Sequence, residues 1–553
     1  MAEIEVVADP KPQQNGDSSR NPNRNHGAPV FDLVVDVWSA AAYGDLEKLR
    51  GFVERNGLSV SNPDGNGYYP LQLAALNNFP NIAQYIIEHG GDVNASDLRK
   101  QTALHWAAVH GSIPVADVLV QNGARVEAAD INGYRAVHVA AQYGQTSFLN
   151  HIIVKYGADF DAPDNDGRSP LHWAAYKGYA DTIRLLLFRD SYQGRQDVDG
   201  CTPLHWAALS SNVEACTVLV HVGNKSELLV RDKKGFTPAE LAANRGHRHA
   251  AYVLTNAAKI NGGVCKDRFC AGRFLKNGYA PILLFVIIIL MVLFLNSIML
   301  GPSFPKVTAV VGLWGWIGLS LAVGSLIMFY RCSSKDPGFI KPDSGKSSHA
   351  SDPLLDIDLN NSVWIGNWSQ LCATCKIIRP VRSKHCPYCM HCVEQFDHHC
   401  PWISNCVGKK NRWDFFVFVC LSALSTFVGA VIAVHRLWTW SPIIPPSEKW
   451  MRVVLMEHPG AVLFLVMDTI VLSGALSLAV VQASQIARNI TTNESANSAR
   501  YSYLRGPDGR FRNPYNHGCR KNCTDFLIYG YISDNEIAWP SLQQAAPLEQ
   551  ATR

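Results

Sequence analysis

Thr202-Pro203-Leu204-His205-Trp206-Ala207-Ala208 is the stretch that decides the fold of the first half of this chain. Close copies of it read Gln101-Thr102-Ala103-Leu104-His105 and Ser169-Pro170-Leu171-His172. Weaker copies begin at Tyr69, Arg135 and Thr237. The matching apolar residue recurs every 33 to 35 residues, at positions 71, 104, 137, 171, 204 and 239. A period of this length predicts stacked copies of one small structural unit.

The residues around each copy predict a turn followed by two short helices. Proline at the first helical position presets φ for the first helix, and Ala207-Ala208 allows close helix packing. Asp-x-x-Gly turns such as Asp130–Gly133 join the units. This pattern resembles the ankyrin repeat. We therefore expect an ankyrin solenoid over residues 35–257, with an N-terminal cap and six repeats. A disordered tail (1–34), rich in Asn, Pro, Gly and Ser, precedes it, and a linker (258–279) follows.

Length and charge limit the remaining possibilities. A chain of 553 residues is too long for one core. The net charge of +4 is small for that length and gives no case for nucleic-acid binding. The first residues are acidic and lack an apolar run, so no cleavable signal peptide is expected.

The second half of the chain contains four long apolar runs. Three of them carry no charge, and the fourth holds a single acid, Asp468. Each run is long enough to cross a hydrocarbon layer of about 30 Å. Buried core helices are the alternative, which four such runs make unfavourable. The predicted spans are residues 280–300, 307–330, 415–434 and 461–483. An acid inside such a run is a functional-site candidate, but Asp468 lies near the luminal end of its span, and we expect it to reach the luminal surface instead.

Lysine and arginine near the spans indicate the orientation. Basic residues precede the first span and follow the second, whereas the hairpin between them holds only Lys306. The positive-inside rule then places both termini and the segment 331–414 in the cytosol. Arg436, Lys449 and Arg452 between the last two spans weaken this bias. The C-terminal region (484–553) is predicted to be cytosolic.

The segment 331–414 holds a dense group of cysteines and histidines within about residues 370–410. Seven cysteines lie between Cys372 and Cys406, together with four histidines. In a reducing compartment, thiols and imidazoles at this spacing are typical zinc ligands. One tetrahedral site needs four ligands and two sites need eight, so some of these residues are left over on any assignment.

This segment resembles the cysteine-rich domain of the DHHC protein S-acyltransferases, or palmitoyltransferases, through Asp397-His398-His399-Cys400 and the Cys-x-x-Cys pairs around it. Other motifs of that family follow in the same order: Asp336-Pro337-Gly338, Thr491-Thr492-Asn493-Glu494, and the Asn513 to Asn522 pattern. With the repeats, the chain is most similar to the plant type called tip-growth-defective. The resemblance implies an all-α protein, with a small two-zinc domain between the second and third of four transmembrane helices.

The resemblance also assigns the residues. One zinc ion would be held by Cys372, Cys375, His385 and Cys392, and the other by Cys386, Cys389, His399 and Cys406. Three residues stay free of metal: Cys400 as the nucleophile, His398 as its base, and Asp397 to orient His398. In this family Thr492 is expected to hydrogen-bond Asp397, and Asn513 to pack.

The implied activity is that of a protein-cysteine S-palmitoyltransferase. Cys400 would take a palmitoyl group from acyl-CoA and pass it to membrane-proximal cysteines of proteins that the repeats recruit. Acyl-CoA is the co-substrate, and two structural Zn²⁺ ions are expected. The resemblance favours a location in the Golgi and related endomembranes, with the endosome or the plasma membrane as alternatives. The anionic CoA head group needs cations at the membrane surface, and the candidates are Arg379, Arg382, Lys384, Lys409, Lys410 and Arg412. An equally good explanation of these charges is that they only fix the orientation of the spans by the positive-inside rule.

Two other functions fit parts of the pattern. An ankyrin-bearing channel or scaffold would use zinc only structurally, but channels need more spans and a re-entrant segment. A zinc-dependent module like that of ubiquitin ligases would give no reason for an Asp-His pair beside a spare thiol. Both are therefore weaker than the acyltransferase reading.

Overall fold

The computed structural model describes residues 34–222, 225–262, 278–301, 306–341, 368–440, 450–505 and 509–532. The chain forms two compact units, one with the repeats and one with the long apolar helices and the cysteine-rich segment. The predicted disordered tail, apart from Val34, and most of the predicted linker lie outside the described residues.

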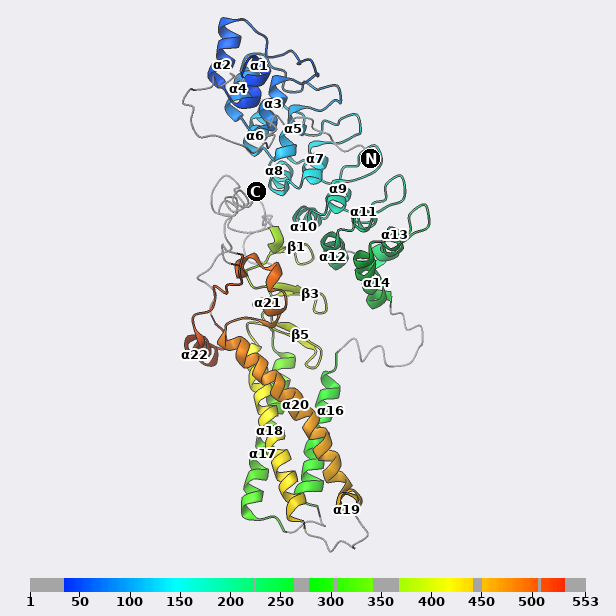
Figure 1. Ribbon diagram of the computed structural model, residues 1–553, viewed down its shortest axis with the longest axis vertical. Helices are drawn as coiled ribbons and strands as arrows, with labels where there is room; N and C mark the ends of the chain where they lie inside the picture. Colours follow the sequence, from blue (N-terminus) through cyan, green and yellow to red (C-terminus); the bar gives the residue numbers. More distant parts are fainter. Residues whose placement is uncertain are drawn as a thin grey trace, which may run out of the picture. The chain divides into compact units, whose positions relative to one another are not determined.

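The repeat unit is a row of seven helix pairs, coloured from blue to green in Figure 1. The sequence predicted a cap and six repeats over residues 35–257; the last helix of this row runs to Gly262. The helices are α1 (Val37–Tyr43), α2 (Leu46–Arg50), α3 (Pro70–Leu76), α4 (Pro80–Glu88), α5 (Ala103–His110), α6 (Ile113–Gln121), α7 (Ala136–Tyr143), α8 (Thr146–Tyr156), α9 (Pro170–Lys177), α10 (Ala180–Phe188), α11 (Pro203–Leu209), α12 (Val213–Val222), α13 (Pro238–Asn244) and α14 (Arg248–Gly262), with the single turns η1 (Gly51–Arg55) and η2 (Lys225–Leu229).

The histidine of each strong copy explains why the pattern repeats. His105 Nδ1 accepts a hydrogen bond from the Thr102 backbone N–H (3.1 Å), which caps α5. Its Nε2 lies 2.9 Å from the carbonyl oxygen of Tyr134 in the next unit. With Nδ1 accepting, Nε2 carries the proton and donates. His205 repeats this link to Phe236 at 3.1 Å. Each histidine thus caps its own helix and holds the following repeat.

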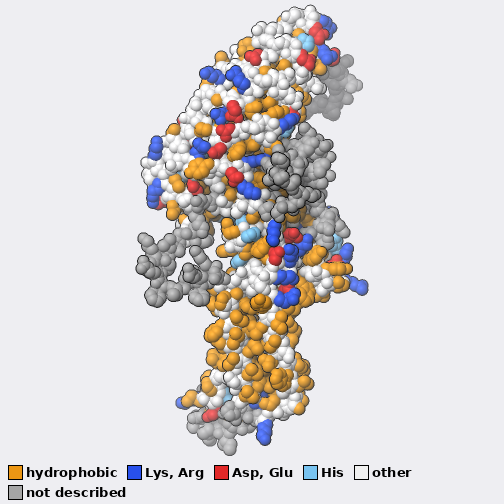
Figure 2. Space-filling view, turned by 180° about the vertical axis from the view of Figure 1, so that it is seen from behind, with side chains coloured by type: hydrophobic (Ala, Val, Ile, Leu, Met, Phe, Trp, Pro, Cys, Tyr) orange, Lys and Arg blue, Asp and Glu red, His pale blue; other side chains and the backbone are white. Residues whose placement is uncertain are grey.

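Four helices of the second unit are long and apolar enough to cross a membrane, among the residues described. They are α16 (Ala280–Leu293) with its continuation η3 (Phe294–Met299), α17 (Ala309–Ser334), α18 (Arg412–Thr439) and α20 (Pro459–Ala487); the short α19 (Trp450–Glu457) precedes α20. Figure 2 shows hydrophobic side chains over their outer surface on one face. Apolar side chains exposed all along a bundle are suited to lipid.

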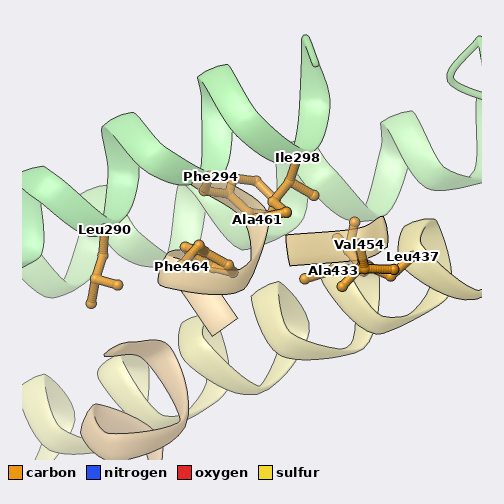
Figure 3. Packing of buried hydrophobic residues seen from close by; sticks show 9 residues of the cluster. Leu290, Phe294, Ile298, Ala433, Leu437, Val454, Ala461 and Phe464 are labelled. Carbon is orange, nitrogen blue, oxygen red and sulfur yellow. The ribbon is translucent and has the colours of Figure 1, made fainter. Parts of the chain in front are cut away.

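The end of the bundle farthest from the cysteine-rich segment has a packed apolar core. Phe294 and Phe464 face each other with ring centroids 5.6 Å apart, and Val454 of α19 closes this end (Figure 3). The core also contains Leu290, Ile298, Ile432, Ala433, Leu437 and Ala461. It joins α16, α18 and α20.

The cysteine-rich segment lies between α17 and α18, as predicted, and the mostly helical fold is confirmed. This segment contains three small antiparallel hairpins, which were not predicted from the sequence. Their strands are β1 (Leu371–Cys372), β2 (Ile377–Ile378), β3 (Lys384–Cys386), β4 (His391–Val393), β5 (His398–Cys400) and β6 (Asn405–Val407). The remaining elements are η4 (Trp368–Gln370), α21 (Thr492–Ala496), η5 (Ser498–Arg500), η6 (Ser502–Leu504) and α22 (Cys519–Tyr529).

Candidate functional site

Two groups of four cysteine and histidine side chains are gathered by the hairpins. The first is Cys372, Cys375, His385 and Cys392, and the second is Cys386, Cys389, His399 and Cys406. The pairing of β3 with β4 sets His385 opposite Cys392, and that of β5 with β6 sets His399 opposite Cys406. Hairpin register therefore brings together ligand types that are seven residues apart in the chain.

The distances within each group suit a tetrahedral metal ion. His385 Nδ1 lies 3.6, 3.3 and 3.8 Å from the sulfur atoms of Cys372, Cys375 and Cys392. His399 Nδ1 lies 3.7, 3.5 and 3.6 Å from those of Cys386, Cys389 and Cys406. Zinc bonds of about 2.0 Å to nitrogen and 2.3 Å to sulfur place such ligand atoms about 3.3–3.8 Å apart. Both groups could hold a metal ion, and their chemistry fits zinc.

Cys400 is the cysteine of this segment that belongs to neither group. It ends β5, next to His399, and is 6% exposed. Burial alone would raise the pKa of the Cys400 thiol, but the hydrogen bond and charge of His398 bring that pKa below its ordinary value. Its surroundings therefore favour a thiolate, which is the nucleophilic form of cysteine.

His398 lies between Cys400 and Asp397. Its Nδ1 is 2.7 Å from Asp397 Oδ2, and its ring meets Phe415 edge-on at 5.4 Å. Burial alone would lower the pKa of His398, but the hydrogen bonds and charges of Asp397 and Cys400 raise it to about 9. At neutral pH this histidine is protonated, so the pair is favoured as imidazolium and thiolate.

Asp397 is fully buried and held from four directions. Thr492 donates twice, from its backbone N–H to Oδ1 (2.9 Å) and from its hydroxyl to Oδ2 (2.8 Å). Gln482 Nε2 donates to Oδ2 at 3.3 Å, and the Arg412 guanidinium lies 3.5 Å from Oδ1. Burial alone would raise the pKa of Asp397, but Arg412, His398 and Thr492 hold it well below its usual range.

The segment after α20 fastens this arrangement. Thr491 caps α21, and Glu494 Oε2 accepts a hydrogen bond from the Thr491 backbone N–H at 2.8 Å. Glu494 also forms a buried ion pair with Arg382 (2.7 Å) of the cysteine-rich segment. Asn513 donates to the carbonyl oxygens of Arg488 and Asn489 at 2.7 and 3.1 Å, which is a packing contact.

The entry to the first apolar helix also contacts the loop after Cys400. The backbone N–H of Tyr279 donates to the Pro401 carbonyl oxygen at 2.7 Å, and that of Ala280 to Ser404 Oγ at 3.3 Å. Gly278 adopts φ +79°, and a Cβ there would lie 2.9 Å from the Pro401 oxygen and clash with Ser404. Glycine is therefore required for this close approach.

A cavity of about 490 Å³ runs from Cys400 into the bundle. Trp402, Phe415 and Phe418 line it near Cys400, and Phe464 and Asp468 line its far end. The lining is almost entirely apolar, as a site for a long hydrocarbon chain would be.

Two predictions about charged residues need correction. Asp468 does not reach the luminal surface: it is 2% exposed and lines the cavity. Arg382 and Arg412 are each 5% exposed and paired with Glu494 and Asp397, so they are structural and not surface cations for CoA. Which lysines and arginines form buried ion pairs depends on contacts between distant segments, and the sequence alone does not show these contacts.

Gln482 was not among the residues predicted to contact Asp397. Its only sequence signal is the pair of amides, Gln482 and Gln485, three residues apart at the end of an apolar run. Thr492 Oγ1 lies 3.1 Å from Gln485 Oε1, so both amides surround the threonine that contacts Asp397.

Comparison with known proteins agrees with this geometry. Residues 366–499 match the DHHC palmitoyltransferase family, and residues 37–130, 126–197 and 190–263 match ankyrin repeats. The chain is 58% identical over 523 residues to "Probable protein S-acyltransferase 23" of Arabidopsis thaliana, which covers 94% of this chain and 98% of that protein.

More distant relatives carry related names. The chain is 28% identical over 640 residues to "Palmitoyltransferase ZDHHC17" of Danio rerio, covering 96% of this chain and 94% of the relative. It is 31% identical over 231 residues to "Palmitoyltransferase ZDHHC14" of Mus musculus, covering 38% and 44%. Because the similarity to the plant relative runs through the repeats, the apolar helices and the cysteine-rich segment alike, this chain belongs to the DHHC palmitoyltransferase family and is an ankyrin-bearing membrane protein S-acyltransferase.

Proposed function

We propose that Cys400 carries the acyl group between an acyl-CoA and a cysteine of a protein substrate. The single observation that supports this most is its position: a buried thiol with a lowered pKa, beside the His398–Asp397 pair and at the entrance of an apolar cavity. None of the eight residues in the two metal-ligand groups combines these features.

The first step is an exchange of one thioester for another. The Cys400 thiolate attacks the carbonyl carbon of the acyl-CoA, a new C–S bond forms, and the bond to the CoA sulfur breaks. The protonated His398 gives its proton to the departing CoA thiolate. Asp397 keeps the imidazole oriented and stabilises its charge. No energy source beyond the thioester is needed.

The second step reverses the roles. A substrate cysteine gives its proton to neutral His398 and attacks the acyl carbon on Cys400. The acyl group leaves on the substrate sulfur, and Cys400 returns to the thiolate beside the imidazolium. The acyl chain stays in the apolar cavity during both steps, where each buried methylene contributes about 0.8 kcal/mol.

Two zinc ions would hold the segment that carries Cys400. The ligand sets are the two groups already described, and when bound, the ions supply folding free energy to a segment whose hairpins are too short to be stable alone. The residues themselves fix the reactive strand: His399 is tied to one group, so its neighbours His398 and Cys400 are held on β5.

The CoA head group requires cations outside this core. Arg379, Lys384, Lys409 and Lys410 remain the candidates, and each already has a partner in the structure; Lys410, for example, pairs with Asp336 at 3.0 Å and is about half exposed. Exchange of such exposed pairs for phosphate is inexpensive, because surface ion pairs contribute little stability.

The repeats are proposed to recruit the protein substrates, since solenoids of this kind offer extended binding surfaces. Deletion of residues 35–257 tests this: substrate selection should change while Cys400 still acquires an acyl group. The membrane is proposed to be an endomembrane of the Golgi type, which the family resemblance favours. Both termini are proposed to lie in the cytosol, from the distribution of lysine and arginine. Protease protection of tagged termini in sealed membranes checks that orientation.

Purified protein incubated with labelled palmitoyl-CoA tests the proposal. We expect a hydroxylamine-sensitive label on the wild type, no label on Cys400→Ser, and a normal label on Cys420→Ser, a matched change in α18 outside the cavity lining. Equal labelling of Cys400→Ser would contradict it.

A further inference from the structure

Asp468 is the acidic side chain in the cavity lining, and the proposed mechanism does not use it. It lies on α20, is 2% exposed, and lines the cavity that begins at Cys400. Its Oδ2 is buried with no hydrogen-bond partner, and no described basic side chain forms an ion pair with it. A buried carboxyl in this condition is unfavourable unless something else completes its hydrogen bonds.

The hydroxyl groups that line the same cavity differ from Asp468 in this respect. Ser425 donates to the Gly318 carbonyl oxygen at 3.1 Å, and Thr426 donates to that of Ser422 at 2.8 Å. Ser422 donates to the Phe418 carbonyl oxygen at 2.9 Å. These hydroxyl groups are hydrogen-bonded within the bundle. Asp468 is therefore the polar group whose hydrogen bonds a ligand would complete.

The depth of Asp468 matches the length of a long acyl chain. Phe415, beside His398, and Gly429 are fourteen positions apart on α18, which is about 21 Å along a helix. A Cβ on Gly429 would lie 3.8 Å from Asp468 Oδ1. An extended chain of sixteen carbons, with bonds of about 1.5 Å, is roughly 19 Å long. The end of such a chain on Cys400 therefore reaches the level of Asp468.

We propose that Asp468 binds a hydroxyl group at the far end of the acyl chain, and that the enzyme prefers long-chain acyl-CoA donors hydroxylated at that end. This rests on the proposed function of Cys400. A hydroxyl both donates and accepts, so it pairs with a carboxyl in either protonation state. A plain methyl end would instead leave the carboxyl without a partner. The hydroxyl takes no part in the transfer.

The test compares two donors on the full-length protein, palmitoyl-CoA and 16-hydroxypalmitoyl-CoA, by the rate of Cys400 acylation at limiting donor. We expect the wild type to favour the hydroxylated donor, and Asp468→Leu to lower the ratio of the two kcat/KM values about tenfold. Asp468→Asn, which still forms hydrogen bonds, should keep the ratio within about twofold of the wild type. Each ratio compares two donors on the same variant. A smaller folded fraction would lower both kcat/KM values equally and leave their ratio unchanged.

Two controls separate the outcomes. Thr469→Val removes a polar group at the same depth on the exposed side of α20 and should leave the ratio unchanged. 2-Hydroxypalmitoyl-CoA carries its hydroxyl near Cys400 and should gain nothing from Asp468. An unchanged ratio in Asp468→Leu, or an equal fall in Asp468→Asn, would overturn the proposal while Cys400 still labels. Failure of the wild type to label with any donor would overturn the acyl transfer itself.

Discussion

Asp397 and Thr492 are 95 positions apart in the chain and are joined by two hydrogen bonds, from the threonine backbone N–H at 2.9 Å and from its hydroxyl at 2.8 Å. The threonine follows the last long helix, whereas the aspartate belongs to the cysteine-rich segment between the second and third. The Asp397 carboxylate, which contacts His398, is therefore itself held by a residue that follows the last long helix.

Thr492→Val should slow Cys400 acylation roughly 10- to 100-fold, because a hydrogen bond to a charged group contributes about 1.5–3 kcal/mol. The backbone hydrogen bond and the fold should survive, since valine has the same shape. Single-turnover labelling measures the rate, and Thr492→Ser, which restores the hydroxyl, should recover most of it. A valine variant as fast as the wild type would show that the side-chain bond has no part in the reaction.

Glu494→Gln should destabilise the protein by about 3–5 kcal/mol, because it leaves Arg382 buried without its charge partner. Thermal unfolding in detergent measures this loss. The matched change Glu394→Gln affects a partly exposed pair with Lys409, whose side chains are 27% (Lys409) and 35% (Glu394) exposed, and should cost about 1 kcal/mol or less.

The same pair predicts a pH dependence. Burial alone would raise the pKa of Glu494, but Arg382 and the hydrogen bond from the Thr491 backbone N–H lower it below its ordinary value. Its stabilising contribution is complete above the pKa of an unfolded glutamate, about 4.3, and is lost as pH falls through the lower folded pKa. The difference in Tm between wild type and Glu494→Gln should therefore shrink below about pH 4. A difference that stays constant down to pH 3 would contradict the ion pair.

Gly278→Ala should slow Cys400 acylation about tenfold or more. The new Cβ would meet Pro401 and Ser404 and displace the loop that follows Cys400. Displacements of about 1 Å near reacting atoms have costs of that size. Gly312→Ala, where the nearest atom is 3.7 Å away in ordinary contact, is the control and should act like the wild type. Rates measured at saturating acyl-CoA would separate the two.

Zinc content tests the two metal-ligand groups. Purified protein should contain about two zinc ions per chain, and Cys392→Ser or Cys406→Ser should each lose about one. His391→Asn changes an exposed histidine outside both groups and should keep both ions. Full zinc content in Cys392→Ser would remove that residue from the ligand set.

The repeats were predictable because their period is local: it is visible in Leu71, Leu104, Leu171 and Leu204. Spacing also indicated zinc ligands, but it left residues over on any assignment, and it was the family resemblance that assigned the two ligand groups. The position of Asp468 was not predictable. The helix around it is apolar on every side, so the pattern of residues does not indicate which face is buried.

Contacts between distant segments were also beyond the sequence. Gly278 and Ser404 lie 126 positions apart, and Gln482 meets Asp397 only because α20 returns to the cysteine-rich segment. Arg382 and Arg412 looked like surface cations since their partners, Glu494 and Asp397, are brought to them by the tertiary fold.

The most direct test of the central claim is peptide mass spectrometry of the full-length protein after a short incubation with palmitoyl-CoA, followed by addition of a substrate protein. We predict a palmitoyl thioester on the peptide that contains Cys400, removed by hydroxylamine and lost as the substrate becomes acylated. A substrate acylated at the same rate by Cys400→Ser, or a thioester found on other cysteines while Cys400 stays unmodified, would contradict it.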